Sequence, residues 1–199
     1  MERAAIILCG GHSSRMGRPK AWLPFGPETM LQRIVRILSA EVSQVIVVAA
    51  QGQELPSLPG IATVVYDEQR DRGPLQGLAR GLRSLSADQV AYVTSCDVPR
   101  LNIAFVRAMF DFLPGYDIAV PQDAAFCHPL AAVYRSTVLP QVQSLLDANQ
   151  LRPMFLFDQA STRFVPVDEL RAADPELTSL DNLNAPEDYD RALRASGLA

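Results

Sequence analysis

The sequence predicts an α/β protein of three layers, in which helices cover both faces of a mostly parallel central sheet. Two observations carry this prediction. Strand-like runs rich in β-branched residues alternate with helix-like segments along the chain. Several runs, such as residues 45–48 (VIVV), are apolar without interruption, which indicates strands buried on both faces, as in a parallel sheet. The 199 residues suffice to bury such a core, and we expect one domain over residues 1–199.

Each element follows from its residue pattern, in chain order. The strand pattern predicts strands at residues 4–9, 45–50, 62–66, 90–95, 118–120 and 130–134. The helical pattern predicts helices at residues 30–40, 74–85, 102–112, 137–149 and 186–195. In the first helix, Leu31, Ile34 and Leu38 recur at three- and four-residue spacing, and Thr29 is placed to cap it. The segment 51–60, with two prolines and two glycines, is expected to be a surface loop.

The composition disfavours several classes of function. The formal net charge is −4 and no basic run occurs, which argues against nucleic-acid partners and membrane-surface binding. No span approaches the ~18 apolar residues that a membrane helix needs. The apolar run at residues 4–9 is too short for a signal peptide, so we expect a cytoplasmic location. Three widely spaced cysteines and two histidines favour reduced thiols over a disulfide framework or a zinc site.

The most informative motif follows the first predicted strand, which stops at Gly10 and Gly11. The residues after these glycines supply hydroxyl groups, positive charge and a further glycine: Ser13, Ser14, Arg15, Gly17 and Lys20. Adjacent glycines let backbone N–H groups approach an anion closely, so the loop is typical of phosphate binding. Five residues separate Gly11 from Gly17 and alanine follows Lys20, so it is not a Walker A motif, and the dinucleotide fingerprint fails too. The loop indicates nucleotide handling of another kind.

Two aspartates lie within two residues of the ends of predicted strands. Asp67 directly follows the third predicted strand, and Asp97 comes two residues after the fourth. The carboxyl ends of parallel strands meet at one edge of a sheet, where ligands gather. An isolated carboxylate there suits Mg²⁺, which takes oxygen ligands, water and substrate phosphates. We favour this role for Asp97 over a turn or helix-capping aspartate before Pro99. The segment 73–77 (GPLQG) begins a helix whose N-terminus is expected to face a nucleotide.

In order and spacing, these motifs resemble the molybdenum cofactor guanylyltransferase family over most of the chain. The matching segments are residues 8–20, Asp67 with 73–77, 96–99 (CDVP), 128–130 (HPL), Arg152 and 182–187 (NLNAPE). The resemblance implies a Rossmann-like three-layer fold of the nucleotide-diphospho-sugar transferase type. It implies a GTP site formed by Leu8, Cys9, Gly10, Gly11, Lys20, Asp67 and Asp97, with Mg²⁺ as cofactor at Asp97. It places His128, Arg152, Asn182 and Asn184 toward the pterin substrate.

The chain departs from the family pattern at two places. Cys9 stands where the family often has alanine, a small-for-small change that is expected to spare the backbone contacts. An asparagine commonly follows the second strand, but this chain has Ala49 and Ala50 there. The residues assigned to the pterin side also have simpler interpretations. His128 can be a loop histidine that is hydrogen-bonded to the backbone, and Arg152 can be a solvated cation at the entrance of a helix. The two asparagines can simply form a turn and cap the last helix.

The reaction implied by the resemblance is transfer of GMP from GTP to the terminal phosphate of Mo-molybdopterin, with release of pyrophosphate. The acceptor is already an anion and needs no general base, so Arg15, Lys20 and Asp97 are expected to act through electrostatics and positioning. Delivery or acceptor proteins of the molybdenum enzyme pathway are possible further partners. Three alternatives stay open: a cytidylyltransferase for the same cofactor, a sugar-phosphate nucleotidyltransferase, and a non-catalytic nucleotide-binding regulator.

Overall fold

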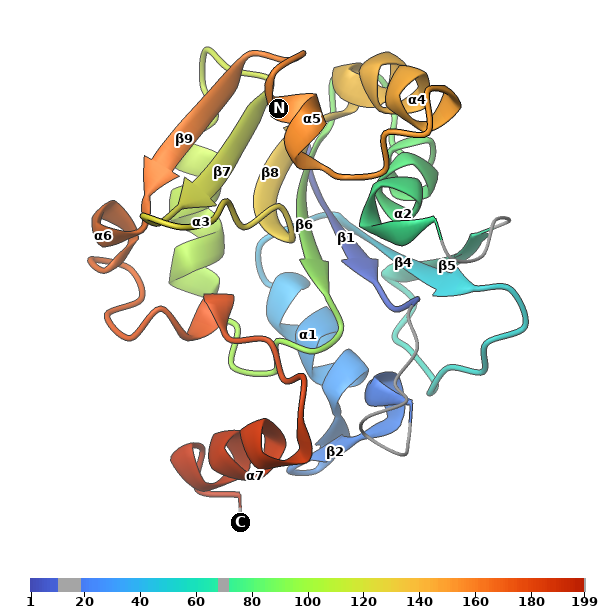
Figure 1. The fold of residues 1–199 in the computed structure, drawn as a ribbon. Helices are drawn as coiled ribbons and strands as arrows, with labels where there is room; N and C mark the ends of the chain where they lie inside the picture. Colours follow the sequence, from blue (N-terminus) through green and yellow to red (C-terminus); the bar gives the residue numbers. More distant parts are fainter. Residues whose placement is uncertain (11–18, 68–71, 199) are drawn as a thin grey trace.

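The computed structural model describes residues 1–10, 19–67 and 72–198, and its centre is a seven-stranded sheet (Figure 1). The strand order is β5-β4-β1-β6-β8-β7-β9. The strands are β1 (Arg3–Leu8), β4 (Gln44–Ala50), β5 (Ala62–Asp67), β6 (Val90–Ser95), β7 (Ile118–Gln122), β8 (Ala131–Arg135) and β9 (Thr162–Pro166). The first four in spatial order are mutually parallel, β8 runs antiparallel to β6 and β7, and β9 is parallel to β7. The predicted mostly parallel sheet is confirmed.

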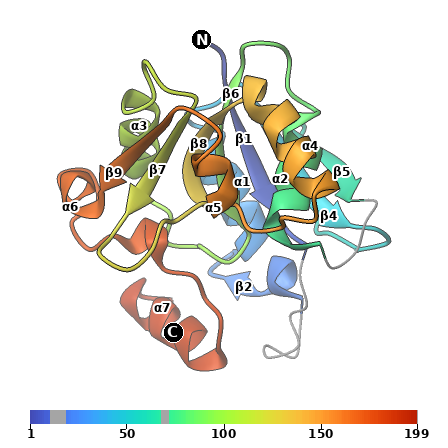
Figure 2. The ribbon, with the colours of Figure 1, turned by 45° about the horizontal axis from the view of Figure 1, so that its top comes forward.

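Helices cover both faces of this sheet, which confirms the predicted three-layer fold. The helices are α1 (Met30–Leu38), α2 (Gly73–Leu82), α3 (Ile103–Asp111), α4 (Leu139–Asp147), α5 (Met154–Phe157), α6 (Val167–Leu170) and α7 (Pro186–Ala195), with short 3₁₀ turns η1 (Lys20–Trp22), η2 (Ser136–Val138) and η3 (Thr178–Leu180). Side chains of α1 and α3, such as Ile34 and Phe105, share one buried cluster. Those of α2 and α4, such as Leu78 and Leu145, share the other. Figure 2 shows α2, α4 and α5 in front of the sheet and α1 and α3 behind it.

Within the described ranges, no helix combines the length and apolar content that crossing a bilayer requires. The structure also contains elements that the sequence pattern did not predict, among them the short helices α5 and α6, an edge strand and a small hairpin. The edge strand β9 extends the sheet beside β7, and β2 (Pro24–Phe25) pairs with β3 (Glu28–Thr29) in a small antiparallel hairpin before α1. The predicted surface loop at 51–60 lies between β4 and β5.

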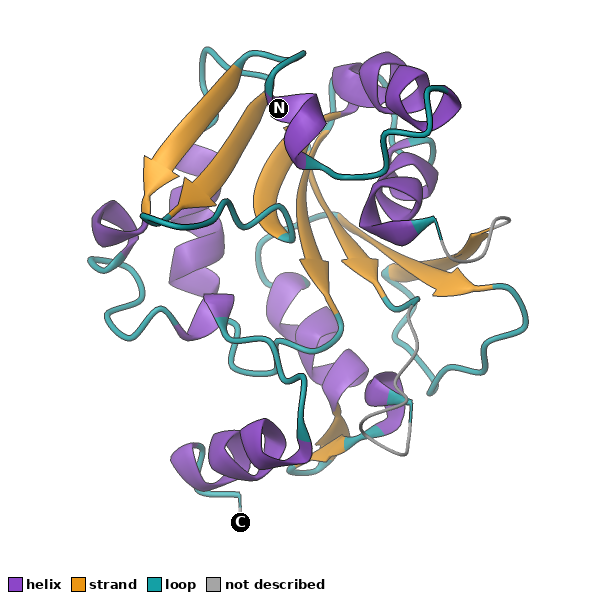
Figure 3. Ribbon diagram, viewed as in Figure 1, coloured by secondary structure: helices purple, strands orange, loops and turns teal. Residues whose placement is uncertain are grey.

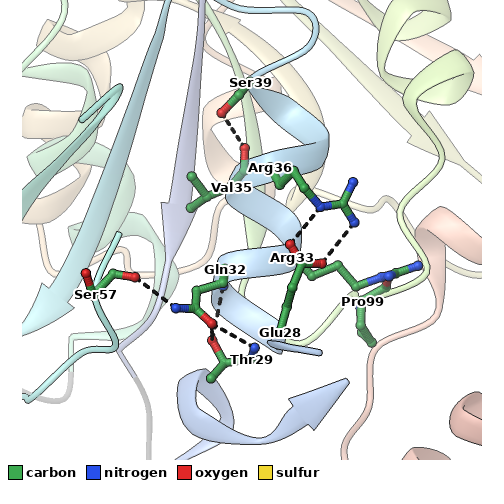
Figure 4. A network of polar contacts seen from close by, with 9 residues as sticks. All are labelled: Glu28, Thr29, Gln32, Arg33, Val35, Arg36, Ser39, Ser57 and Pro99. Carbon is green, nitrogen blue, oxygen red and sulfur yellow. Dashed lines mark hydrogen bonds and ion pairs between the residues drawn. The ribbon is translucent and has the colours of Figure 1, made fainter. Parts of the chain in front are cut away.

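The start of α1 is fixed by the predicted Thr29 cap, which is confirmed. The Thr29 hydroxyl accepts from the Gln32 amide at 3.3 Å, and the Gln32 side chain accepts from the Thr29 amide at 2.9 Å, a complete capping box (Figure 4). The same Gln32 side chain donates to the Ser57 carbonyl, and Arg33 donates to the Pro99 carbonyl at 2.7 Å. Helix α1 therefore anchors both the loop after β4 and the loop after β6.

The C-terminal helix α7 packs away from the two main clusters, against the β2–β3 hairpin (Figure 3). A third cluster of buried side chains joins them: Leu23, Phe25, Met30, Leu183 and Ala192. The Tyr189 hydroxyl donates to the Pro24 carbonyl. This packing draws the segment before α7 across the edge of the sheet where β1 and β6 end, because the Leu183 amide donates to the Asp97 carbonyl at 2.9 Å.

Candidate active site

The centre of the candidate site is an ion pair between Lys20 and Asp97. Asp97 lies at the carboxyl end of β6, in the middle of the sheet, and is only 7% exposed. Lys20 opens the 3₁₀ turn η1, and its Nζ lies 2.7 Å from Asp97 Oδ2. The cationic end of the predicted phosphate loop and the predicted metal-binding carboxylate therefore meet, although 77 residues separate them in the sequence.

Three further polar side chains hold this pair in place. Ser95 donates its hydroxyl proton to Asp97 Oδ1, and Asn182 donates to the same oxygen at 3.3 Å. Asn184 accepts from Lys20 Nζ at 3.1 Å. Both asparagines reach the site because the segment containing them lies against Asp97. The start of α7 is capped by Asp188, whose carboxylate accepts from the amides of Asn184 and Ala185. The asparagine side chains are thus committed to the site instead of the helix cap.

The exit of β1 is fixed by a glutamine that sequence reasoning missed. The Cys9 amide donates to the Val48 carbonyl at 2.8 Å, which continues the β1–β4 ladder past Leu8. The Gln53 side chain donates to the Cys9 carbonyl at 3.2 Å and accepts from the Ala50 amide at 3.0 Å. One carboxamide therefore links the ends of β1 and β4, in the region where an asparagine was expected. Its position in an irregular loop gave no spacing signal that could have found it.

Asp67 and Arg152 lie elsewhere along the same edge. Asp67 ends β5 in register with Ala50, so β4 and β1 separate it from β6 and Asp97. Arg152 is exposed next to Leu151, whose carbonyl lies 3.8 Å from the position that a Cβ would take on Gly73 at the start of α2. Gly73 has a φ of +72°, a backbone conformation that glycine adopts without strain. The structure thus places Arg152 near the N-terminus of α2.

His128 precedes β8, whose first residue Ala131 pairs with Thr94 near the carboxyl end of β6. Its Nε2 lies 2.9 Å from Asp123 Oδ2, and its amide donates to the Pro121 carbonyl at 2.9 Å. The amide of Ala125 and the His128 side chain, together with the Phe126 amide, lower the pKa of Asp123. The imidazole therefore has a carboxylate partner in its own loop. Gly11 and Arg15, which were also assigned to the site, lie outside the described residues.

Comparison with known proteins gives the family. Residues 5–162 match the model described as the MobA-like NTP transferase domain. The chain belongs to this family. A probable molybdenum cofactor guanylyltransferase from Methanosarcina mazei is 31% identical over 96% of this chain and 90% of the relative. The enzyme is accordingly a nucleotidyltransferase, and the resemblance that the sequence motifs indicated is confirmed.

Solved structures carry the same fold as this MobA-like transferase. Molybdopterin-guanine dinucleotide biosynthesis protein A from Archaeoglobus fulgidus superposes with a TM-score of 0.80 at 19% identity, covering 99% of this chain and all of that one. A Mycobacterium tuberculosis protein, Rv0371c, solved in complex with manganese, superposes with a TM-score of 0.62 at 18% identity, covering 98% of this chain and 100% of that one. At these identities the likeness establishes the fold.

The donor set of the MobA-like transferase fits a hard divalent cation. Asp97 offers carboxylate oxygens, and Asn184 offers an amide oxygen that accepts from Lys20, whereas Asn182 turns its amide nitrogen toward Asp97. Among the described residues, no group of three or more His, Cys, Asp or Glu side chains is placed to hold a metal ion. A cation at Asp97 would therefore take most of its ligands from water and substrate phosphates, which is how Mg²⁺ is usually bound at nucleotide sites. The set lacks the thiolate and imidazole ligands that zinc prefers.

Proposed function

We propose that this nucleotidyltransferase transfers GMP from GTP to the terminal phosphate of Mo-molybdopterin, releasing pyrophosphate and forming the molybdopterin guanine dinucleotide cofactor. The observation that carries the proposal is the Lys20–Asp97 pair, held by both asparagines at the edge of the sheet where β1 and β6 end. It unites a phosphate-binding cation and a metal-binding carboxylate in a chain of the MobA-like family. The name of the Methanosarcina mazei relative supports guanine as the base and the molybdenum cofactor as the acceptor.

The chemistry requires positioning and charge compensation. An oxygen of the acceptor phosphate attacks the α-phosphorus of GTP, and the bond from that phosphorus to the bridging oxygen of pyrophosphate breaks. The attacking oxygen is already anionic, so no general base is needed. Lys20 compensates charge on the phosphate groups, and Asn184 orients its ammonium group. The backbone of Leu8, Cys9 and Gly10 would hold the nucleotide, with Gly11 and Arg15 continuing the same loop.

Asp97 would hold the divalent cation, which we propose to be Mg²⁺. When bound, such a cation neutralises phosphate oxygens and orients them for in-line displacement. Ser95 and Asn182 fix the carboxylate of Asp97 so that it is preorganised for this task. Asp67 would contribute to the nucleotide site from the end of β5. His128 and Arg152, on the loop before β8 and beside α2, would contact the pterin substrate, and Asn182 and Asn184 would border it.

The deciding experiment measures pyrophosphate release by the purified protein with Mg²⁺ and Mo-molybdopterin, comparing GTP, CTP, ATP and UTP. GTP-selective release is the expected result. Release with CTP alone would keep the mechanism and overturn the base. Measurable GTP binding without release from any nucleotide would favour a regulatory protein. The variant Lys20→Ala serves as the matched control for release by a contaminating enzyme.

A further inference from the structure

The Lys20–Asp97 pair joins two side chains that the proposed function assigns to different ligands. Lys20 is assigned to the phosphates of the nucleotide and Asp97 to a divalent cation, yet Lys20 Nζ lies 2.7 Å from Asp97 Oδ2. The two side chains are only 17% and 10% exposed, so solvent screens their attraction little. The ammonium group therefore occupies a carboxylate oxygen that a metal ion at Asp97 would also use.

The other side chains that contact Asp97 are neutral. Ser95 donates its hydroxyl proton and Asn182 an amide proton to Oδ1, the second carboxylate oxygen. A carboxylate accepts at about four positions, so these two hydrogen bonds and the Lys20 contact leave little room for a further ligand. Of these three partners Lys20 is the charged one, and its charge repels any cation that approaches Asp97. Lys20 is thus the partner that competes with a metal ion.

The segment before α7 holds the ammonium group of Lys20 against Asp97. Asn184 Oδ1 accepts from Lys20 Nζ at 3.1 Å, and the Leu183 amide donates to the Asp97 carbonyl at 2.9 Å. One short stretch of chain thus contacts both members of the pair. A lysine ammonium group is a point charge on a flexible stem, so it can turn toward a stronger source of negative charge without movement of the backbone. The phosphates of a nucleoside triphosphate, with several negative charges, are such a source.

We propose that Lys20 blocks metal binding at Asp97 until a nucleotide binds. In the closed form the ammonium group of Lys20 neutralises Asp97 and holds its Oδ2. In the open form the ammonium group contacts phosphate oxygens of the nucleotide, and Oδ2 is available as a metal ligand. The exchange moves one side chain and makes or breaks no covalent bond. The opening by GTP rests on the proposed function, whereas the competition between Lys20 and a metal ion for Asp97 can be measured with the metal alone.

The proposal gives the removal of Lys20 two effects of opposite sign. When a protein spends only a fraction of its time in the form that binds a ligand, its apparent affinity for that ligand falls by this fraction. Lys20→Ala leaves Asp97 open at all times, so we expect this variant to bind a divalent cation about tenfold more tightly or better. The same variant is expected to lose turnover, because it lacks the phosphate-binding cation. Removing a lysine with a merely structural role would lower both quantities.

The test titrates the purified protein with Mn²⁺ and follows the NMR signal of the Asp97 amide, because a bound paramagnetic ion broadens the signals of nearby protons. With Mn²⁺ alone, we expect this signal to broaden at concentrations about tenfold lower in Lys20→Ala than in the unmodified chain. With GTP and Mn²⁺ together, we expect the unmodified chain to respond at the lower concentrations too. Equal responses of the two proteins to Mn²⁺ alone, or no broadening in either, would overturn the competition. No effect of GTP on the unmodified chain would overturn the opening by nucleotide.

Two variants are matched controls for charge. Lys20→Arg keeps the positive charge and should respond to Mn²⁺ alone as the unmodified chain does. Arg171→Ala removes a positive charge that pairs with Asp168 and should also leave the response unchanged. Lys20→Gln, which has no charge but can still donate to Asn184, replaces Lys20→Ala if circular dichroism shows that the shorter side chain prevents folding. Failure of the proposed function would appear separately, as absent pyrophosphate release in a protein that still shows the difference between Lys20→Ala and the unmodified chain.

Discussion

Asp97 has both carboxylate oxygens engaged by side chains from three separate parts of the chain: Lys20, Ser95 and Asn182. The side chain of Lys20 in this pair is only 17% exposed, so solvent screens it little. A charge held in this way is preorganised and has its greatest value where phosphate charge is redistributed during a reaction.

We therefore expect Lys20→Ala and Asp97→Ala each to lose about a hundredfold or more in turnover, or about 3 kcal/mol of transition-state stabilisation. Steady-state pyrophosphate release with GTP measures this loss, and circular dichroism checks that each variant is folded. Arg171→Ala is a suitable control, because Arg171 is an exposed cation that pairs with Asp168 and donates to the Pro175 carbonyl instead of contacting Lys20 or Asp97. Turnover near that of the unmodified chain in either variant would remove the residue concerned from the mechanism.

The two asparagines contact different members of the Lys20–Asp97 pair. Asn184 accepts from Lys20, and Asn182 donates to the carboxylate of Asp97. Removing a partner that orients a ligand typically costs about 10–100-fold in activity. We expect Asn182→Ala to weaken mainly the binding of Mg²⁺, so that a higher metal concentration is required for half-maximal rate. Asn184→Ala should instead lower kcat at saturating Mg²⁺. Identical Mg²⁺ dependence in both variants would contradict this division.

At this scale the sequence predicts part of the site. Lys20 and Asp97 carry recognisable motifs, since each follows a strand and stands at a fixed distance from glycine or proline. Asn182 and Asn184 entered through family resemblance, but their contacts with Asp97 and Lys20 depend on how α7 packs. Gln53 gave no signal, because a carboxamide in an irregular loop looks the same whether it is solvated or bonded to two strand ends.

Among the elements, α2 shows how tightly a helix can approach the sheet. A Cβ on Gly81 would lie 2.5 Å from Ile6 Cγ2 and 2.9 Å from its Cδ1, and Ile6 is fully buried in the central strand β1. Gly81→Ala gains about 1 kcal/mol in helix propensity but overpacks the core, which typically costs about 1–3 kcal/mol. We expect net destabilisation in urea unfolding. The cost should shrink in an Ile6→Ala background, and an unchanged cost would show that the contact is not responsible.

The N-terminus of α7 couples a helix cap to the site. Hydrogen bonds from the amides of Ala185 and Asn184 lower the pKa of Asp188 below its ordinary value of 3.8. Because the folded-state pKa is depressed, the stabilisation is complete above the unfolded value and is lost as the pH falls through the lowered one. We expect Asp188→Ala to speed hydrogen exchange of the Asn184 and Ala185 amides at neutral pH. Exchange as slow as in the unmodified chain would contradict the cap.

The elements that the sequence predicts are those with a local signal. The predicted bounds of the periodic helices agree with the structure to within a few residues. Helix α7 spans the predicted residues, and its start is marked by Pro186 at the first helical position. Strand β9 was missed because Thr162–Pro166 buries only Val165 and depends on its pairing with β7. The β2–β3 hairpin was missed because two-residue strands have no periodicity. In both cases distant contacts decide the structure.

Over the whole molecule, the buried side chains divide into two clusters on the sheet faces and a third that joins α7 to the hairpin. The third cluster is small, and α7 contributes only one buried residue, Ala192. Elements with little buried surface open locally at lower free energy than the core of a domain. The part of the chain that supplies Asn182 and Asn184 is therefore less firmly anchored than the part that supplies Asp97.

Native-state hydrogen exchange tests this difference in stability. We expect amides of α7 to exchange through local opening, well before those of β1 and β6, which should require global unfolding. GTP with Mg²⁺ should slow exchange at Leu183 and in α7, because the nucleotide, Lys20 and Asn184 would then hold the segment together, and a ligand that binds the closed form stabilises it by mass action. CTP at the same concentration is the control for base selectivity. Equal protection of α7 and β1 without nucleotide would mean that the C-terminal segment is part of the core, and the site would then be rigid before its substrate arrives.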